Sequence, residues 1–380
     1  MSNSTQQVTN QNYPEMPQNF HQGDEIDLRE LFIELWKGKW IIVLSIFIFA
    51  IGAVIYALQA QEWWSSKAKI TQPQLQDIAA YQQQVKQFQP VFDIYQEDGT
   101  ILVSEELNDL TNTHELFKRF IDGFNSSNNK KSFLDTSSEF QIFKHQLKES
   151  TVGKEDVEKE ANRKLYAEWF QRIVANVENK KVVGSPYNVS FQSTTKESSF
   201  IMLSKYIEII QTKARNDALN NLEAIITAKK NELVQQKRIL ISQAKNRLSV
   251  EVERSKYALD IAKAAEVNQP IQTSSIQEIF SIDLGTKALA AKVKALESVK
   301  NLSVIEPRLQ QIDAKLDMLN DLKVDRSIEF QTFRFLENVE QPISRDKPKR
   351  ALIVVLGTLL GGMLGVAIVL VRFAFRREED

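Results

Sequence analysis

The sequence contains no cysteine and only three histidines in 380 residues. Without cysteine, disulfide bonds, a thiolate nucleophile and cysteine-ligated zinc or iron–sulfur sites are all excluded. The histidines, His21, His114 and His145, are far apart in the chain and lack metal-ligand spacing. Their ordinary interpretation is as surface residues, so we expect no metal site and no cofactor.

Motifs for nucleotide or hydrolytic chemistry are also missing. The chain has no GxxxxGK[ST] phosphate loop, no GxSxG nucleophile elbow, no HExxH pair and no GxGxxG dinucleotide motif. Acidic residues are plentiful but alternate with lysines in helical patterns, which is typical of solvated faces. The formal net charge of -1 gives no bias towards nucleic acid. We therefore expect neither an enzyme nor a nucleic-acid-binding protein.

Two long uncharged runs lie near the ends of the chain. Residues 40–58 and 351–371 contain no charged side chain, and about 20 apolar residues in a helix are enough to cross a bilayer. The first run is too far from the N-terminus, and its apolar core is too long, for a cleavable signal peptide. The sequence therefore predicts two transmembrane helices on either side of a large domain at 59–350.

The charges beside these spans set the expected orientation. Lys37 and Lys39 precede the first span, and Arg372 begins a basic segment after the second, although further basic residues lie just before the second span. Long loops cross a membrane largely regardless of charge, whereas short tails do not. We therefore expect the tails, 1–39 and 372–380, in the cytoplasm and the central domain on the other side.

The second span carries a group of glycines, Gly357, Gly361, Gly362 and Gly365. Gly357, Gly361 and Gly365 are four residues apart and so share one helix face, where small residues let helix backbones approach closely in lipid. Glycine without a packing role is the alternative, because glycine is common in membrane helices. We favour a packing face. The expected partner is the first span, which has small residues of its own: Ala50, Gly52, Ala53 and Ala57.

Three segments of the central domain have the composition and alternation of strands: 63–71, 187–193 and 327–335. Because these segments are far apart in the sequence, they must meet in space, which predicts one mixed α/β base. Helical patterns broken by turns fill 74–145, and a charged amphipathic helix is predicted over 154–178.

A very long helix follows the second predicted strand. Thr194 and Glu197 form a capping-box pattern, and neither proline nor glycine occurs from there to Val267. The helix predicted over about 195–267 would be about 100 Å long at about 1.5 Å per residue, so it must project from the base. Its apolar stripe recurs at intervals of mostly three or four and includes Leu203, Ile207, Ile210, Leu222, Ile225, Leu233, Leu240 and Leu248. The stripe needs partners from this chain or from copies of it, and we assign it to bundling that includes contacts between copies.

The remaining segments lead back to the second span. Helical patterns resume at about residue 286 and continue, with a break at Pro307, to about residue 322. These helices can run back along the long one. The polar segment before the second span contains Pro342 and Pro348, which predicts a stiff, extended approach.

Stretches near both spans and around the helix tip resemble one family. They are 25–36 and 63–73 around the first span, 257–262 and 280–285 at the tip, and 342–350 with 359–363 at the second span. Together they resemble the Wzz family, the polysaccharide co-polymerases that regulate O-antigen chain length in Gram-negative bacteria. The resemblance covers 24–373. Residues 1–23 fall outside it and are expected to be disordered.

The resemblance implies an α+β membrane protein of the inner membrane, with a periplasmic α/β base and both termini cytoplasmic. It implies a homo-oligomer, a ring or bell, that acts with a Wzy-type polymerase as a non-catalytic scaffold, with lipid-linked polysaccharide as a further partner. Such proteins set the modal length of O-antigen. Carried onto this sequence, the segment from Pro342 to Pro348 and the pair Gly361 and Gly362 would be the membrane-proximal elements needed for regulation. The segment 24–36 would form a helix on the inner leaflet or a simple juxtamembrane helix.

Other functions remain open at this point. A co-polymerase for another surface polysaccharide, such as enterobacterial common antigen or capsule, would share these features, and a coiled-coil envelope adaptor is a further alternative. A co-polymerase with an attached kinase would need a phosphate loop after the second span. A sensor would need a cytoplasmic output module, and an adaptor typically lacks a second span.

Overall fold

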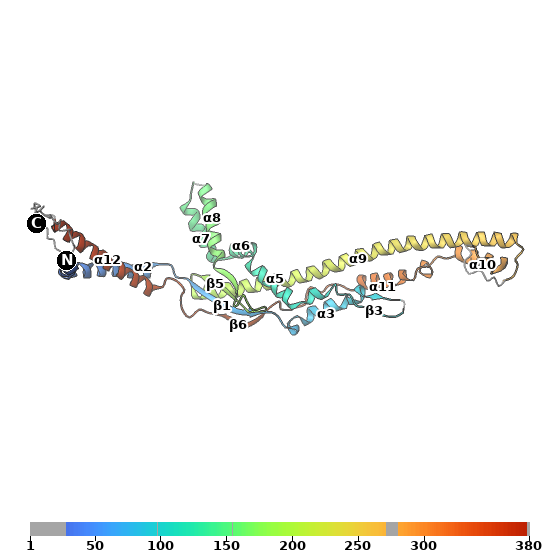
Figure 1. The fold of residues 1–380 in the computed structure, drawn as a ribbon, viewed down its shortest axis with the longest axis horizontal. Helices are drawn as coiled ribbons and strands as arrows, with labels where there is room; N and C mark the ends of the chain where they lie inside the picture. The colour runs from blue at the N-terminus through green and yellow to red at the C-terminus, as the bar shows by residue number, and fades with distance from the viewer. Residues whose placement is uncertain (1–27, 97, 154, 271–279, 378–380) are drawn as a thin grey trace, which may run out of the picture. The chain divides into compact units, whose positions relative to one another are not determined.

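The computed structural model describes residues 28–96, 98–153, 155–270 and 280–377 (Figure 1). The chain divides into two compact units. One contains the described residues up to Glu62 and those from Asp346 on, and the other runs from Trp63 to Arg345. The predicted disorder of 1–23 lies outside the described residues.

The first unit consists of three helices, α1 (Leu28–Lys37), α2 (Lys39–Gln59) and α12 (Arg350–Arg377). Both α2 and α12 are long and apolar enough to cross a membrane. Only 6% of the most apolar part of α2 and 17% of that of α12 is buried, so neither is the core helix of a soluble domain. The two predicted spans are therefore confirmed as helices, each slightly longer than its uncharged run.

Helix α1 confirms a helical segment before the first span. Its large side chains Phe32 and Trp36 are 75% and 73% exposed. Lys39 Nζ lies 5.0 Å from the ring centroid of Trp36, at the junction with α2. An exposed aromatic face fits a helix that lies on a lipid surface, and it fits a juxtamembrane helix equally well.

The second unit is built on an antiparallel sheet with the strand order β4-β5-β1-β6. The strands are β1 (Trp64–Thr71), β4 (Ile173–Val177), β5 (Tyr187–Ser193) and β6 (Arg334–Glu340). The two strands predicted over 63–71 and 187–193 are confirmed, and they pair with each other from Trp64 opposite Ser193 to Ile70 opposite Tyr187.

The prediction of a strand over 327–335 is wrong by about seven positions, because β6 starts only at Arg334. Before that point the backbone bonds elsewhere: Gln331 N donates to the carbonyl of Asp77 at 3.0 Å. Phe330 stacks on Tyr81 with 4.6 Å between ring centroids. The alternation of apolar residues in this segment therefore reflects burial under a helix, with no strand pairing.

The prediction of one helix over 154–178 is also wrong at its C-terminal end. Helix α8 (Glu155–Phe170) stops before Ile173, which begins the edge strand β4. Ile173 is fully buried opposite Phe191 of β5. The four-residue spacing of Leu165, Trp169 and Ile173 continues through the junction, so the apolar pattern does not mark the end of the helix.

Short helices and one small hairpin lie between β1 and β4. They are η1 (Leu75–Ile78), α3 (Ala79–Gln87), α4 (Gln89–Phe92), β2 (Ile94–Tyr95), β3 (Ile101–Leu102), η2 (Asn108–Thr111), α5 (Thr113–Asn125), α6 (Ser127–Thr136) and α7 (Ser138–Ser150). The hairpin β2–β3 forms a separate two-stranded sheet. Its turn contains Gly99 in the left-handed region at φ +88, where a side chain would be strained.

The very long helix is confirmed as α9 (Lys196–Ala264), with 69 residues. Its N-cap is Thr195, whose hydroxyl accepts the N–H of Ser198 at 3.0 Å. The predicted capping box of Thr194 and Glu197 is therefore wrong by one position. Thr194 N instead donates to Glu139 Oε1 at 2.9 Å, which holds this residue outside the helix.

Two helices return along α9, as predicted (Figure 1). They are α10 (Gly285–Glu297) and α11 (Arg308–Asp321), separated by the short turn η3 (Leu302–Val304). Lys237 of α9 pairs with Asp313 of α11 at 2.6 Å, and Lys256 pairs with Glu297 of α10 at 2.6 Å. These pairs show that the returning helices are antiparallel to α9.

The apolar core runs along α9 and narrows towards its end. One cluster joins the sheet, α5 and the first turns of α9, and a second joins α3, α11 and the middle of α9. Among the described residues, the buried members of the third cluster, at the end of α9, are Ala258, Ala262 and Leu289. Burial of apolar surface therefore holds the base more strongly than the tip.

Candidate functional site

Gly361 of α12 lies directly against α2. A Cβ atom placed on Gly361 would lie 2.8 Å from Phe49 Cβ and 3.0 Å from Ile46 Cα. A contact this short against backbone leaves no room for a side chain. The small residue therefore sets the distance between the two helices.

Gly357 and Gly365 lie one turn to either side and face the same helix. A Cβ on Gly357 would be 2.5 Å from Ala53 Cβ, and a Cβ on Gly365 would be 2.8 Å from Ile42 Cα. The structure thus brings together three of the four glycines singled out in the sequence. Their role in regulation stays a prediction.

Two other glycines lie away from this contact. A Cβ on Gly362 would be 3.7 Å from its nearest neighbour in Ile46, an ordinary van der Waals distance, and one on Gly52 would meet nothing within 4 Å. Of the small residues expected to pack on the first span, Ala53 faces Gly357 and Ala57 is buried, whereas Gly52 is exposed.

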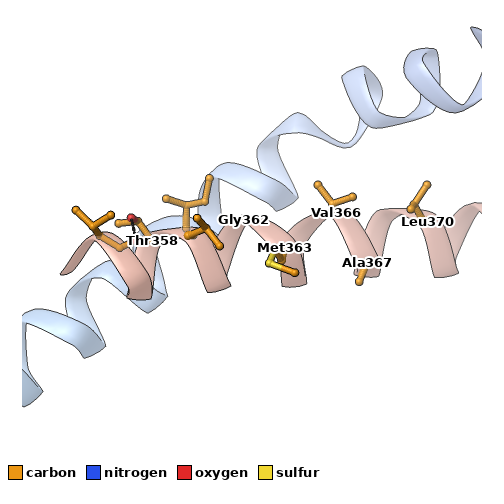
Figure 2. Close-up of a pocket in the computed structure, with 9 residues that line it drawn as sticks. Thr358, Gly362, Met363, Val366, Ala367 and Leu370 are labelled. Atoms are coloured by element: carbon orange, nitrogen blue, oxygen red, sulfur yellow. Dashed lines mark hydrogen bonds between the residues drawn. The ribbon is translucent and has the colours of Figure 1, made fainter. Parts of the chain in front are cut away.

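Figure 2 shows a groove beside this contact, lined by α12 side chains and by Ile46 of α2. The lining is apolar except for Thr358, whose hydroxyl donates to the carbonyl of Val355 at 2.8 Å. Gly362 lies on this face. The groove offers van der Waals contact and no free polar group, so it suits an apolar neighbour such as a lipid chain.

Polar bonds fix the helix pair at two levels. Ser45 Oγ donates to the carbonyl of Gly361 at 2.7 Å, within the span. At the end of the pair, Arg350 Nε donates to the carbonyl of Ala57 at 3.1 Å and Arg350 Nη2 donates to Glu62 Oε1 at 2.7 Å. Neither Ser45 nor Arg350 was identified as an interaction partner from the sequence, although Arg350 stands out as the last cation before an uncharged run.

The proline segment contains the boundary between the two units. Pro342 follows β6 in the second unit, and Pro348 precedes α12 in the first. Both prolines are half-buried, while Ile343 between them is 97% exposed. The sequence places proline where the chain passes from one unit to the other.

The predicted stripe of α9 is covered within a single chain. Leu203, Ile207, Ile210, Leu222, Leu233 and Leu240 are between 0% and 8% exposed. Ile225 packs against the second cluster, and Leu248 is half-buried. The buried members pack on the sheet and on helices of the same chain, so this chain supplies their partners, which is one of the two alternatives considered from the sequence. Contacts between copies along the stripe stay a prediction.

A carboxylate that sequence reasoning missed links α7, β5 and the start of α9. Glu139 accepts hydrogen bonds from the hydroxyls of Ser193 and Ser198 and from the N–H of Thr194. Burial opposes ionisation of Glu139, but these hydrogen bonds outweigh it and hold its pKa below the ordinary value. The carboxylate therefore fixes the point where the long helix leaves the sheet.

A second carboxylate that sequence reasoning missed lies where the returning chain meets the middle of α9. The Glu306 side chain is 3% exposed and accepts from Arg247 Nη1 of α9 at 2.9 Å and from the Arg308 guanidinium. The hydrogen bond from Arg308 holds the pKa of Glu306 below its ordinary value, against the effect of burial. A single acid between Ile305 and Pro307 gives no sequence signal for such a position.

Neither described histidine belongs to a metal site. His114 Nδ1 lies 3.1 Å from Gln72 Nε2, and His145 Nδ1 lies 3.3 Å from Glu149 Oε1 one turn along an exposed helix. Among the residues that the structure describes, no group of three or more acidic, histidine or cysteine side chains is placed to hold a metal ion. His21 lies outside the described residues.

Two family models match the chain at the places where the spans lie. Residues 24–112 match the model Wzz, chain length determinant protein, and residues 308–374 match the model GNVR, described as a G-rich domain on putative tyrosine kinase. A solved structure of a full-length bacterial polysaccharide co-polymerase is 26% identical and superposes with a TM-score of 0.62. The superposition covers 92% of this chain and 99% of that chain.

Curated relatives match over almost their whole length. The ferric enterobactin transport protein FepE of Escherichia coli (strain K12) is 27% identical over 98% of this chain and 96% of its own. The chain length determinant protein of Shigella dysenteriae is 28% identical over 94% of this chain and 95% of its own length. The ECA polysaccharide chain length modulation protein of Salmonella typhimurium is 25% identical over 92% of this chain and 95% of its own length. These relatives differ in the role that their names give.

The architecture and the matches agree. The sheet, the 69-residue helix with its returning helices and the two apolar helices are all present in this chain. The chain therefore matches the Wzz chain length determinant model at residues 24–112, is similar to chain length determinant proteins along nearly its whole length, and has the fold of a polysaccharide co-polymerase.

Proposed function

We propose that this protein regulates the modal chain length of O-antigen made by a Wzy-type polymerase, as a non-catalytic, homo-oligomeric scaffold of the inner membrane. The observation that carries the proposal is the single 69-residue helix, sealed by its own chain, in a unit flanked in sequence by two apolar helices. The match to chain length determinant proteins along nearly the whole chain supports it.

The proposal includes an orientation. Both termini lie in the cytoplasm and the second unit, Trp63–Arg345, lies in the periplasm. The basic residues Lys37 and Lys39 before α2 and Arg372 near the end of α12 support this placement, because basic residues are retained on the cytoplasmic side. Fusion of a periplasm-dependent reporter to residue 100 and to the C-terminus tests it: activity is expected only at the first site.

Within this proposal the helix pair couples assembly in the membrane to the periplasmic unit. Gly357, Gly361 and Gly365 let α2 and α12 pack closely, and the proline segment from Pro342 to Pro348 links that pair to β6. Prolines restrict backbone rotation, which stiffens this link. Lipid-linked polysaccharide and the polymerase are the partners of the assembled particle.

A second candidate is chain-length control of another surface polysaccharide. The similarity to the ECA polysaccharide chain length modulation protein, at 25% identity, favours it over unrelated functions. The two candidates share the scaffold mechanism and differ only in the polymer.

Deletion of the gene in its host tests both candidates. We expect O-antigen to remain but to lose its length clustering on a lipopolysaccharide gel, and a plasmid copy to restore it. A normal O-antigen profile with an altered length distribution of another polymer would favour the second candidate. Unchanged lengths of every surface polysaccharide, or complete loss of O-antigen, would contradict the proposal. Growth with ferric enterobactin as iron source should be unaffected, which separates this role from the one that names FepE.

A further inference from the structure

The hairpin β2–β3, α9 and α11 enclose a cavity of about 480 Å³, which we call the hairpin groove. This volume lies within the range of small-ligand pockets, about 300–1,000 Å³. One wall is formed by Ile94 and Tyr95 of β2, and the others by α9 and α11. The whole groove lies within the second unit.

The floor of the hairpin groove is apolar and tightly packed. Leu233, Leu240 and Ile312 are 3%, 8% and 7% exposed. Above this floor the ring of Tyr95 is 38% exposed. A half-exposed aromatic ring offers a flat apolar face on which a ligand can stack.

The rim of the groove is rich in side-chain amides. Gln243 of α9 and Gln311 of α11 are exposed, and no described residue forms a hydrogen bond with either side chain. Gln236 is positioned by its own bond, in which Nε2 donates to Glu232 Oε1 at 2.8 Å. Each amide can donate and accept hydrogen bonds at the same time, as neighbouring hydroxyl groups require.

Among the described residues that line the groove, two are cations and none is a carboxylate. Lys315 Nζ donates to the carbonyl of Asp93 at 2.5 Å and lies 5.7 Å from the Tyr95 ring centroid. Burial, reinforced by nearby Lys229, lowers the pKa of Lys315. Glu306 holds Arg308 in place through two hydrogen bonds. Both cations are thus fixed before any ligand arrives.

We propose that the hairpin groove binds a short segment of saccharide chain. A sugar ring presents a C–H face that can stack on Tyr95 and a rim of hydroxyls that can bond to Gln243 and Gln311. An acyl chain would leave the amides unsatisfied, and an apolar helix of a second copy would bury them without partners, which costs free energy. This inference deepens the proposed function and rests on it for the choice of polymer.

Binding of oligosaccharide to the full chain in lipid nanodiscs tests the inference by calorimetry. The probe is surface polysaccharide released from the host by mild acid and fractionated to short oligomers, with size-matched dextran as control. The variant Gln243→Ala/Gln311→Ala is expected to lower affinity about tenfold, because two hydrogen bonds are lost. Its matched control, Gln235→Ala/Gln310→Ala, changes exposed glutamines of the same helices outside the groove and should bind normally.

Substitution of Tyr95 separates the contribution of ring stacking to saccharide affinity from the other contributions. Tyr95→Phe keeps the ring and is expected to bind normally, whereas Tyr95→Ala should weaken binding. Equal binding by all variants, equal binding of dextran, or loss of oligomer in the Gln243→Ala/Gln311→Ala variant would overturn the inference. The last result would mean that a second copy occupies the groove.

The binding and deletion experiments fail independently. Saccharide binding without any change in polymer length after gene deletion would contradict the proposed function and leave the inference about the hairpin groove standing. Altered polymer length without saccharide binding would contradict the inference about the hairpin groove and leave the proposed function standing.

Discussion

Arg350 Nη2 lies 2.7 Å from Glu62 Oε1, so the first residue of α12 is tied to the chain just beyond α2. The same guanidinium donates through Nε to the carbonyl of Ala57, in the last turn of α2. Carbonyl groups at a helix C-terminus lack intrahelical partners and attract cations. One arginine therefore closes the helix pair where it meets the polar segment.

Loss of this arginine should loosen the helix pair. We expect Arg350→Ala to lower the stability of the helix pair by about 1 kcal/mol, because it loses an ion pair and a bond to a helix end. Thermal unfolding in detergent measures the change. The exchange Arg350→Glu/Glu62→Arg should recover part of the loss. Equal effects of the single and exchanged variants would show that the ion pair does not contribute.

Close packing at Gly361 gives a paired prediction. Gly361→Ala places a methyl group 3.0 Å from Ile46 Cα and should cost about 1–3 kcal/mol as overpacking. Gly362→Ala meets nothing closer than 3.7 Å and should be tolerated. Oligomer yield after detergent extraction and polymer length in a complemented deletion strain are the measurements. If Gly362→Ala is the more harmful, the groove beside the pair is the functional face.

A pH dependence follows from the pair that joins η1 to the start of β6. Arg334 Nε and Nη2 donate to the Asp77 carboxylate at 3.0 and 2.8 Å, and these hydrogen bonds hold the pKa of Asp77 below its ordinary value. The stabilisation is present above the unfolded-state pKa, about 3.9, and is lost as pH falls through the lower folded-state value. Asp77→Asn should therefore be less stable than the unmodified chain at pH 7, and in acid unfolding followed by circular dichroism the difference should shrink as the pH falls below the unfolded-state value. A constant difference across this range would contradict the assignment.

Adjacent isoleucines on α9 test which face is sealed within the chain. Ile210 is 1% exposed and packs against the sheet cluster, whereas Ile209 is 49% exposed. Ile210→Ala should cost about 2–5 kcal/mol in chemical unfolding, because it leaves a cavity. Ile209→Ala should cost about 1 kcal/mol or less. A larger loss for Ile209→Ala that depends on protein concentration would place a copy on that face.

Elements with long, unbroken patterns were predictable from the sequence. The absence of proline and glycine after Thr194 was enough to predict α9, and the uncharged runs were enough to predict α2 and α12. The sequence could not show which elements pack on the apolar stripe of α9. That depends on α3, α5 and α11, whose contacts with α9 link distant parts of the chain.

Boundaries decided by tertiary bonds were not predictable. Residues 327–333 alternate like a strand, but Gln331 N bonds to the carbonyl of Asp77 and the segment never joins the sheet. The edge strand β4 was hidden because the helical spacing up to Trp169 continues to Ile173. The glycine face was predictable because it needs only helical spacing. The hairpin groove was not, since it joins residues from three separate segments.

The sealed stripe of α9 has a consequence for how the protein reaches its working form. In the proposed oligomeric scaffold, a subunit whose long helix is already covered by its own chain folds before it meets a copy, so assembly follows mass action. Particle abundance should then follow gene dosage, with unassembled subunits persisting undegraded when expression is low.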